Sequence, residues 1–149
     1  MPELDVADLA LSVSFYTDVL GFVVSFERRA ERFAYLTTGG AELMLQEAVG
    51  PGRRFRFAPL EYPFGRGVNF QLAVADVDAI YERVIAGGYE PVVAMEERWY
   101  QVDVASPGGR WTSVGPTEAG NRQFVVADPD GYLWRPFKDL GVRSSARGQ

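Results

Sequence analysis

The stretch Val6-Ala7-Asp8-Leu9 has a near copy further along the chain, at Val74-Ala75-Asp76-Val77. Each copy closes a short apolar segment, and its aspartate lies where the N-cap acceptor of a helix is needed. Apolar residues at helical spacing follow each aspartate, and a glycine with an aromatic residue, at 21–22 and 88–89, ends each helical pattern. The repeat therefore predicts two copies of a strand followed by a helix.

A second similarity extends the repeat into the strands that follow. Residues 33–40 and 124–131 both run from an apolar strand into a glycine turn, after which a further strand begins. A strand is also expected at 22–27, directly after the first helix. The sequence thus predicts an α+β fold in which two βαβββ modules in tandem form paired, cup-shaped mixed sheets.

The chain is expected to form one domain over residues 1–141, since its 149 residues fall within the usual range for a single domain. Module one is expected at 2–47 and module two at 68–141. The intervening residues 48–67 carry three prolines, four glycines and four arginines among aromatic residues, which predicts a linker. Residues 142–149 have little apolar content and are expected to be a flexible tail.

Module two contains a region that module one lacks. Residues 96–105 are strand-like but polar and aromatic, and they include Trp99 and Tyr100. Residues 106–120 are rich in Ser, Pro, Gly and Thr, contain Trp111 and are expected to form an irregular excursion. Aromatic side chains flanked by polar and turn residues are candidates for contact with a ligand.

The composition excludes several kinds of chemistry. The chain has no cysteine and no histidine, so disulfides, thiolate nucleophiles and imidazole ligands are all excluded. The formal net charge of −5 argues against binding to a nucleic-acid backbone and favours a cationic partner. No apolar run approaches the roughly 20 residues that cross a membrane, and the N-terminus does not resemble a secretion signal. We therefore expect a cytoplasmic protein that binds neither nucleic acid nor a membrane.

Several short motifs resemble those of one known superfamily. They are Asp8-Leu9, Ser14-Phe15-Tyr16, Leu20-Gly21-Phe22 and Asp128-Pro129-Asp130-Gly131-Tyr132-Leu133. Together they are similar to motifs of the vicinal oxygen chelate superfamily, also called the glyoxalase/bleomycin resistance/dioxygenase superfamily, over about residues 2 to 141. The resemblance implies the same pair of βαβββ modules. It leaves the activity open, because one fold hosts many unrelated functions.

The resemblance also places four positions at which metal-dependent members of the superfamily carry their ligands. In this chain those positions hold Met1, Met44, Asn69 and Arg135. A guanidinium cannot ligate a cation at ordinary pH, and a thioether is a poor ligand for hard divalent ions. We therefore expect no metal and no other cofactor. A site made only of carboxylates, from residues such as Glu42 or Glu47, remains an alternative.

The segment Gly120-Asn121-Arg122-Gln123-Phe124 resembles the Gly-x-Arg-x-Phe motif of bleomycin resistance proteins. The resemblance implies a homodimer that sequesters a flat, cationic glycopeptide without chemistry. Those proteins place an aromatic side chain near the position of Gly120, where this chain has Ala119-Gly120. Trp99, Tyr100 or Trp111 could replace it.

The sequence accordingly favours metal-independent binding and sequestration of a small, planar, cationic molecule, with bleomycin-type antibiotics as candidates. Two alternatives stay open: a metal-dependent lyase, isomerase or dioxygenase of the same superfamily, and a non-catalytic protein-interaction domain. The sequence therefore allows either an enzyme or a binding protein and favours a binding protein without catalytic residues. The predicted ligand-binding residues are Met44, Asn69, Gln71, Trp99, Tyr100, Trp111 and Arg135.

Overall fold

The computed structural model describes residues 1–102 and 117–145 and forms two four-stranded sheets. In chain order the elements are β1 (Glu3–Val6), α1 (Leu9–Ser14), a π-helical turn (Phe15–Val19), β2 (Val23–Arg28), a short 3-10 turn (Arg29–Glu31), β3 (Phe33–Thr38), β4 (Ala41–Glu47), β5 (Asn69–Ala73), α2 (Val77–Ala86), β6 (Val93–Val102), β7 (Thr117–Ala127) and β8 (Leu133–Ser144). Among the described residues, no helix is long and apolar enough to cross a membrane.

The two sheets have the same topology. Their strand orders are β1-β4-β3-β2 and β5-β8-β7-β6, and we call them sheet A and sheet B. In each, the first strand of the module pairs in parallel with the last, and the remaining neighbours are antiparallel. The predicted fold class, two βαβββ modules in tandem, is confirmed.

The two predicted N-caps are also confirmed. An Asp8 side-chain oxygen accepts a hydrogen bond of 3.0 Å from the Leu11 amide, and an Asp76 side-chain oxygen accepts one of 3.0 Å from the Ala79 amide. Each bond satisfies one of the backbone N–H groups that have no partner within the first turn of a helix. The repeated aspartate therefore begins α1 and α2 in the same way.

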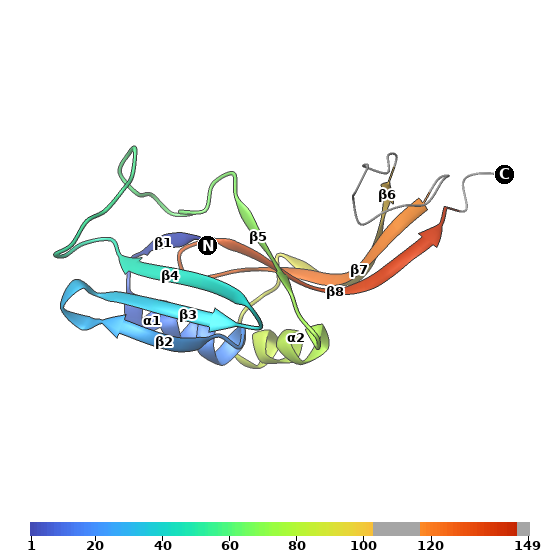
Figure 1. Ribbon diagram of the computed structural model, residues 1–149, viewed down its shortest axis with the longest axis horizontal. Coiled ribbons are helices and arrows are strands. Elements are labelled where there is room, and N and C mark those ends of the chain that lie inside the picture. The colour runs from blue at the N-terminus through green and yellow to red at the C-terminus, as the bar shows by residue number, and fades with distance from the viewer. Residues whose placement is uncertain (103–116, 146–149) are drawn as a thin grey trace.

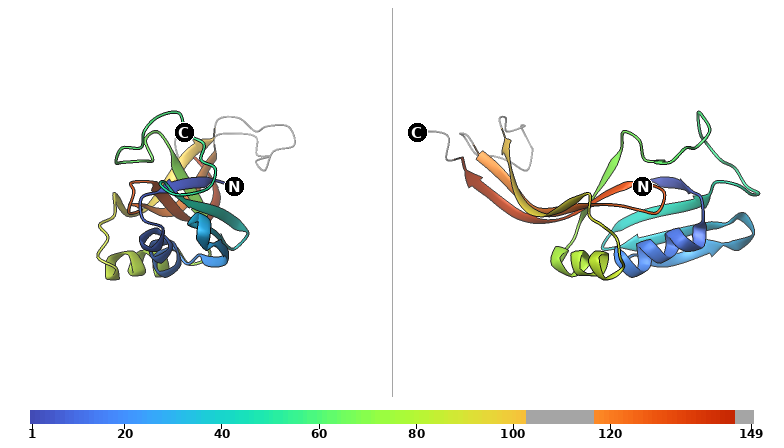
Figure 2. Two further views of the ribbon diagram at one scale, coloured as in Figure 1. Left: turned by 90° about the vertical axis from the view of Figure 1, so that its left-hand side faces the viewer. Right: turned by 180° about the vertical axis from the view of Figure 1, so that it is seen from behind.

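Both helices lie on the same side of the sheets, while the long connection from β4 to β5 passes over the other side (Figure 1). Figure 2 shows α1 and α2 next to each other beneath the two modules. Strand residues that face the helices are buried in one common core, among them Val6, Leu36, Leu45, Phe124 and Trp134. We call the opposite face of each sheet, which neither α1 nor α2 covers, its open face.

A buried hydrogen-bond network joins the two modules at Asp128. This carboxylate is 3% exposed and accepts a 2.5 Å bond from the Tyr16 hydroxyl of module one. Its other oxygen accepts bonds from the amides of Asp130 and Tyr132, at 2.9 and 2.8 Å. The Trp134 indole donates to the Tyr16 hydroxyl at 2.9 Å. Every partner in this network is supplied by the protein, so its burial is compensated.

Burial sets the protonation of this network. It raises the pKa of the Tyr16 phenol well above its usual value, and the charge of the neighbouring Asp128 adds to the shift. Burial also raises the pKa of the Asp128 carboxyl, although hydrogen bonds from Tyr16, Tyr132 and Asp130 act in the opposite direction. The phenol therefore keeps its proton and donates a hydrogen bond to Asp128.

The same turn is attached to the first strand and helix of module one. The Asp130 carboxylate accepts bonds from the Ala7 amide, at 3.2 and 3.3 Å, and from the Ser12 hydroxyl at 3.4 Å. The Tyr132 hydroxyl donates to the Asp5 carbonyl at 3.0 Å. The Asp-Pro-Asp-Gly turn thus holds the start of β8 against β1 and α1.

Two predicted boundaries differ from the structure. Strand β7 already begins at Thr117, within the expected excursion, and β8 continues to Ser144, beyond the expected start of the tail at 142. Backbone pairing of Ala119 with Val142 and a 3.0 Å ion pair between Glu118 and Arg143 hold these strand ends together. Such pairing does not require apolar side chains, which is why composition alone did not reveal it.

Replacing Tyr16 by Phe should destabilise the protein by about 1 to 3 kcal/mol, because Asp128 and the Trp134 indole would each lose a buried partner. Urea denaturation of the wild type and the variant measures this loss. Tyr62→Phe is a matched control, since the Tyr62 side chain is 66% exposed. If both substitutions change the free energy of unfolding equally little, the network does not hold the modules together.

Candidate functional site

Polar side chains from three strands meet on the open face of sheet B. The Tyr100 hydroxyl on β6 accepts a 2.7 Å hydrogen bond from the Gln123 side-chain amide on β7 and a 3.3 Å bond from the Arg135 guanidinium on β8. The same Gln123 nitrogen lies 3.3 Å from a carboxylate oxygen of Glu96. We call Glu96, Tyr100, Gln123 and Arg135 the open-face cluster.

Strand alternation explains how these side chains come together. In β7, Phe124 is fully buried in the core and Arg122 bonds Asp78 on α2 at 2.6 Å, so both point to the helix side. Gln123 lies between them and must point to the open face, because successive side chains in a strand alternate. On β6, a β-bulge between Val93 and Glu96 sets the register that brings Glu96 opposite Gln123.

The cluster contains two buried polar atoms without a protein partner. Gln123 is 4% exposed. Over the described ranges 1–102 and 117–145, its Oε1 and the Nε of Arg135 are the buried side-chain nitrogen or oxygen atoms that have no hydrogen-bond partner. Buried polar groups are normally hydrogen bonded, and an unsatisfied one costs free energy. The protein itself thus leaves one acceptor and one donor of this cluster without a hydrogen bond.

The structure brings some of the predicted ligand-binding residues together. Arg135 and Tyr100 are hydrogen bonded, and Gln71 on β5 is the register partner of Arg135. Asn69 is exposed on the same strand and pairs with Leu133. Met44 on β4 lies between the buried Leu43 and Leu45, so it belongs to the open face of sheet A in the other module.

Trp99 lies apart from Tyr100. The two residues are neighbours on β6, so their side chains point to opposite faces. The Arg143 guanidinium lies 3.8 Å from the centre of the Trp99 ring. The ring also packs on Gly120, where a Cβ atom would come within 2.7 Å of its carbons. Trp99 therefore packs on Gly120 from the adjacent strand, while Trp111 lies outside the described residues.

Gln123 and Glu96 were not among the predicted site residues. Gln123 was part of the quoted Gly120 to Phe124 segment, and its place between Arg122 and a core phenylalanine was the available signal. Nothing in the local sequence of Glu96 distinguishes it from a solvated strand residue. Its role depends on the bulge in β6, which pattern alone does not show.

Glu42 and Glu47, the carboxylates named for an alternative metal site, are engaged in other contacts. Glu47 accepts bonds from Arg32 at 2.7 Å and from the Leu9 amide at 3.1 Å. Glu42 interacts with the Tyr35 phenol, and this hydrogen bond raises the pKa of Tyr35. Among the residues that the structure describes, no three Asp or Glu side chains are grouped so that they could hold a metal ion.

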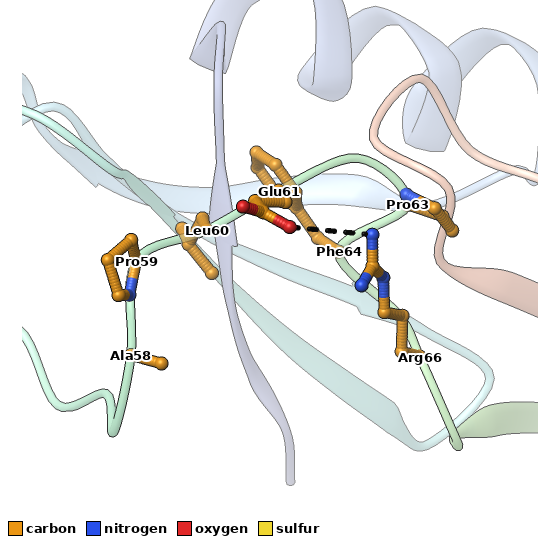
Figure 3. Close-up of a pocket in the computed structure, with 7 residues that line it drawn as sticks. All are labelled: Ala58, Pro59, Leu60, Glu61, Pro63, Phe64 and Arg66. Atoms are coloured by element: carbon orange, nitrogen blue, oxygen red, sulfur yellow. Dashed lines mark ion pairs between the residues drawn. The ribbon is translucent and has the colours of Figure 1, made fainter.

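The linker forms cavities of its own. One of about 350 Å³ is lined by Ala58, Pro59, Leu60, Glu61, Pro63, Phe64 and Arg66. Figure 3 shows that all its walls come from the linker, with an ion pair of 3.8 Å between Glu61 and Arg66. A second cavity of about 290 Å³ lies beside β1, where Arg56 pairs with Asp5 at 3.1 Å. Neither cavity contains a residue of the open-face cluster.

Comparisons with known proteins agree with this architecture. The family model described as "Glyoxalase/Bleomycin resistance protein/Dioxygenase superfamily" matches residues 3–135. The chain therefore belongs to this superfamily. No curated protein matches the chain.

Several solved structures share the fold. TioX from Micromonospora sp. ML1 is 24% identical with a TM-score of 0.63, covering 93% of this chain and 96% of its own. A protein of unknown function from Agrobacterium tumefaciens str. C58 is 26% identical with a TM-score of 0.61, covering 93% and 91%. Virulence protein STM3117 from Salmonella typhimurium is 17% identical with a TM-score of 0.62, covering 91% of both chains. The matches extend over both modules, and at these identities we take from them the fold alone.

Proposed function

We propose that this protein binds and sequesters a small planar molecule on the open face of sheet B, without a bound metal. The observation that carries the proposal is the pair of buried, unpartnered atoms of Gln123 and Arg135 beside the Tyr100 ring. Tyr100 is 39% exposed, so its ring remains accessible to a guest. A planar molecule could stack on this ring while its polar edge meets the two unpartnered atoms.

The metal-independent part of the proposal is supported by the residues at the superfamily's ligand positions. Arg135 occupies one of them and is hydrogen bonded to Tyr100, so a permanent positive charge stands where metal-dependent members carry a ligand. Met1 and Met44 at two of the other positions offer thioethers, which are poor ligands for hard divalent ions, so Asn69 is the one oxygen ligand among the four positions.

We also propose that the bound molecule is cationic, because of the charge of the protein. The chain carries a net charge of −5, which attracts cations over a distance. On β6, the Glu96 carboxylate belongs to the cluster. Together with the resemblance to bleomycin resistance proteins, this charge makes a bleomycin-type antibiotic the first ligand to test.

Metal-free bleomycin should bind the wild type and change its tyrosine and tryptophan fluorescence, whereas Tyr100→Phe should bind about tenfold more weakly because the hydroxyl that orders Gln123 and Arg135 is lost. Fluorescence titration measures both affinities. Tyr62→Phe, a substitution on the linker, is the matched control.

The metal-independent claim is tested with the same samples. A bound ion would stabilise the folded state by mass action, so EDTA, Zn²⁺, Mn²⁺, Ni²⁺ and Fe²⁺ should leave the melting temperature unchanged. Elemental analysis that finds close to one metal per chain would refute the claim.

In the bleomycin titration, binding that is equally strong in Tyr100→Phe would place the drug elsewhere.

We further propose that the protein is a homodimer whose interface includes the linker and the edge of sheet A formed by β2 and the β3–β4 hairpin. Phe55 and Phe57 on the linker are 73% and 111% exposed, and Val23 and Phe26 are exposed on the edge strand β2. Exposed apolar side chains beside an unpaired strand edge favour association.

Light scattering at micromolar concentration should give the mass of two chains. The double substitution Phe55→Asp with Phe57→Asp should give a monomer with an unchanged circular dichroism spectrum, since both side chains are exposed. Leu11→Asp, which alters an exposed apolar residue on the helix side, is the control and should remain dimeric. A wild-type protein with the mass of one chain would contradict the proposal.

A further inference from the structure

We infer that a cavity beside α1 is a second binding site, and that it takes a small organic anion with a carboxylate head on an apolar body. The cavity has a volume of about 570 Å³, which lies within the range of small-molecule sites. Its lining contains none of the four residues of the open-face cluster, so the inference is independent of the proposed function.

The floor of the cavity is the apolar side of α1. Leu9 and Val13, one helical turn apart, line it together with Ala10. Leu9 and Val13 are half-buried against the core, while Ala10 is exposed. Apolar surface that the protein leaves uncovered becomes more favourable when an apolar guest covers it. The floor therefore fits the apolar body of a ligand.

Two ion pairs form the polar wall of the cavity. The Arg29 Nε donates to Glu27 at 3.2 Å, and the Arg32 Nη1 donates to Glu47 at 2.7 Å. The second carboxylate oxygen of Glu47 accepts a 3.1 Å bond from the Leu9 amide. Both oxygens of Glu47 are thus engaged by the protein.

The arginines of this wall retain unused hydrogen-bond donors. Within residues 1–102 and 117–145, neither terminal nitrogen of Arg29 and not the Nη2 of Arg32 has a hydrogen-bond partner. The Arg29 side chain is 91% exposed, so a ligand can reach it. A guanidinium nitrogen can only donate, and its planar fork matches the two oxygens of a carboxylate.

The charges of the wall do not select an anion by their sum, because its two arginines and two glutamates cancel. Selection comes from the donors that remain free. A carboxylate would accept from them while its apolar body covers the floor. A neutral alcohol would cover the floor with one weaker polar contact, and an ammonium group would face the two guanidinium groups.

Three probes that share one apolar body test the inference: 3-phenylpropanoate, 3-phenylpropanol and 3-phenylpropylammonium. NMR titration up to about 10 mM measures their dissociation constants for the wild-type protein, since such small molecules bind weakly. The carboxylate should bind about fivefold more tightly than the alcohol, the effect of an ion pair at a partly exposed site, and the ammonium should bind most weakly.

A substitution on the floor shows whether the probes bind in this cavity. Ala10→Glu should weaken 3-phenylpropanoate about tenfold or more, because the new side chain covers the floor and its charge repels the ligand. Leu11→Glu is the matched control. It adds the same charge in the first turn of the same helix, at an exposed residue that does not line the cavity, and should leave the affinity unchanged.

A substitution on the wall tests recognition of the carboxylate. Arg29→Gln should weaken 3-phenylpropanoate about threefold and leave 3-phenylpropanol unchanged, because the free donors of Arg29 are lost while the floor stays intact. Arg28→Gln removes a neighbouring charge that pairs with Glu31 at 3.1 Å and does not line the cavity. This control should bind all three probes like the wild type.

Each contrary result overturns the inference. Equal affinity of the wild type for the carboxylate and the alcohol would show that no anion is selected. Undiminished binding of 3-phenylpropanoate by Ala10→Glu would place the probe elsewhere, and absence of binding by all three probes would show that the cavity is not a site. The proposed function is decided separately by bleomycin binding to the wild type and Tyr100→Phe.

Discussion

The buried carboxylate of Asp128 is the interaction on which the structure depends. It receives the phenol of Tyr16 from module one and closes the turn that precedes β8 in module two. Removing it would leave the Tyr16 hydroxyl without its acceptor in the core. The same turn sets where β8 begins, and Arg135 lies near the start of that strand. The contact between modules and the position of the candidate site are therefore set by one residue.

The module plan could be predicted from the sequence because it depends on local and repeated signals. Asp8 and Asp76 cap their helices as expected, since capping involves only a few neighbouring residues. Arg135 was a candidate because the resemblance places it at a metal-ligand position of the superfamily. In the structure Arg135 donates a hydrogen bond to Tyr100, a partner that the resemblance did not predict.

The rest of the site could not be predicted, because it depends on which strands meet and on which face each side chain lies. Trp99 and Tyr100 are neighbours in sequence and were grouped together, yet strand alternation separates them. Bulges between Val93 and Glu96 and between Gly120 and Asn121 change this alternation locally. Gln123 looked like an ordinary strand residue, and only its burial and its unpartnered oxygen identify it as part of a site.

The most direct test of the account is NMR of the Gln123 side-chain amide and the Arg135 Nε–H group while metal-free bleomycin is added. We expect both signals to shift together and to saturate with the same dissociation constant as the fluorescence change, because both groups line the proposed binding face. If bleomycin binds while both signals stay unchanged, the open face of sheet B is not the binding site.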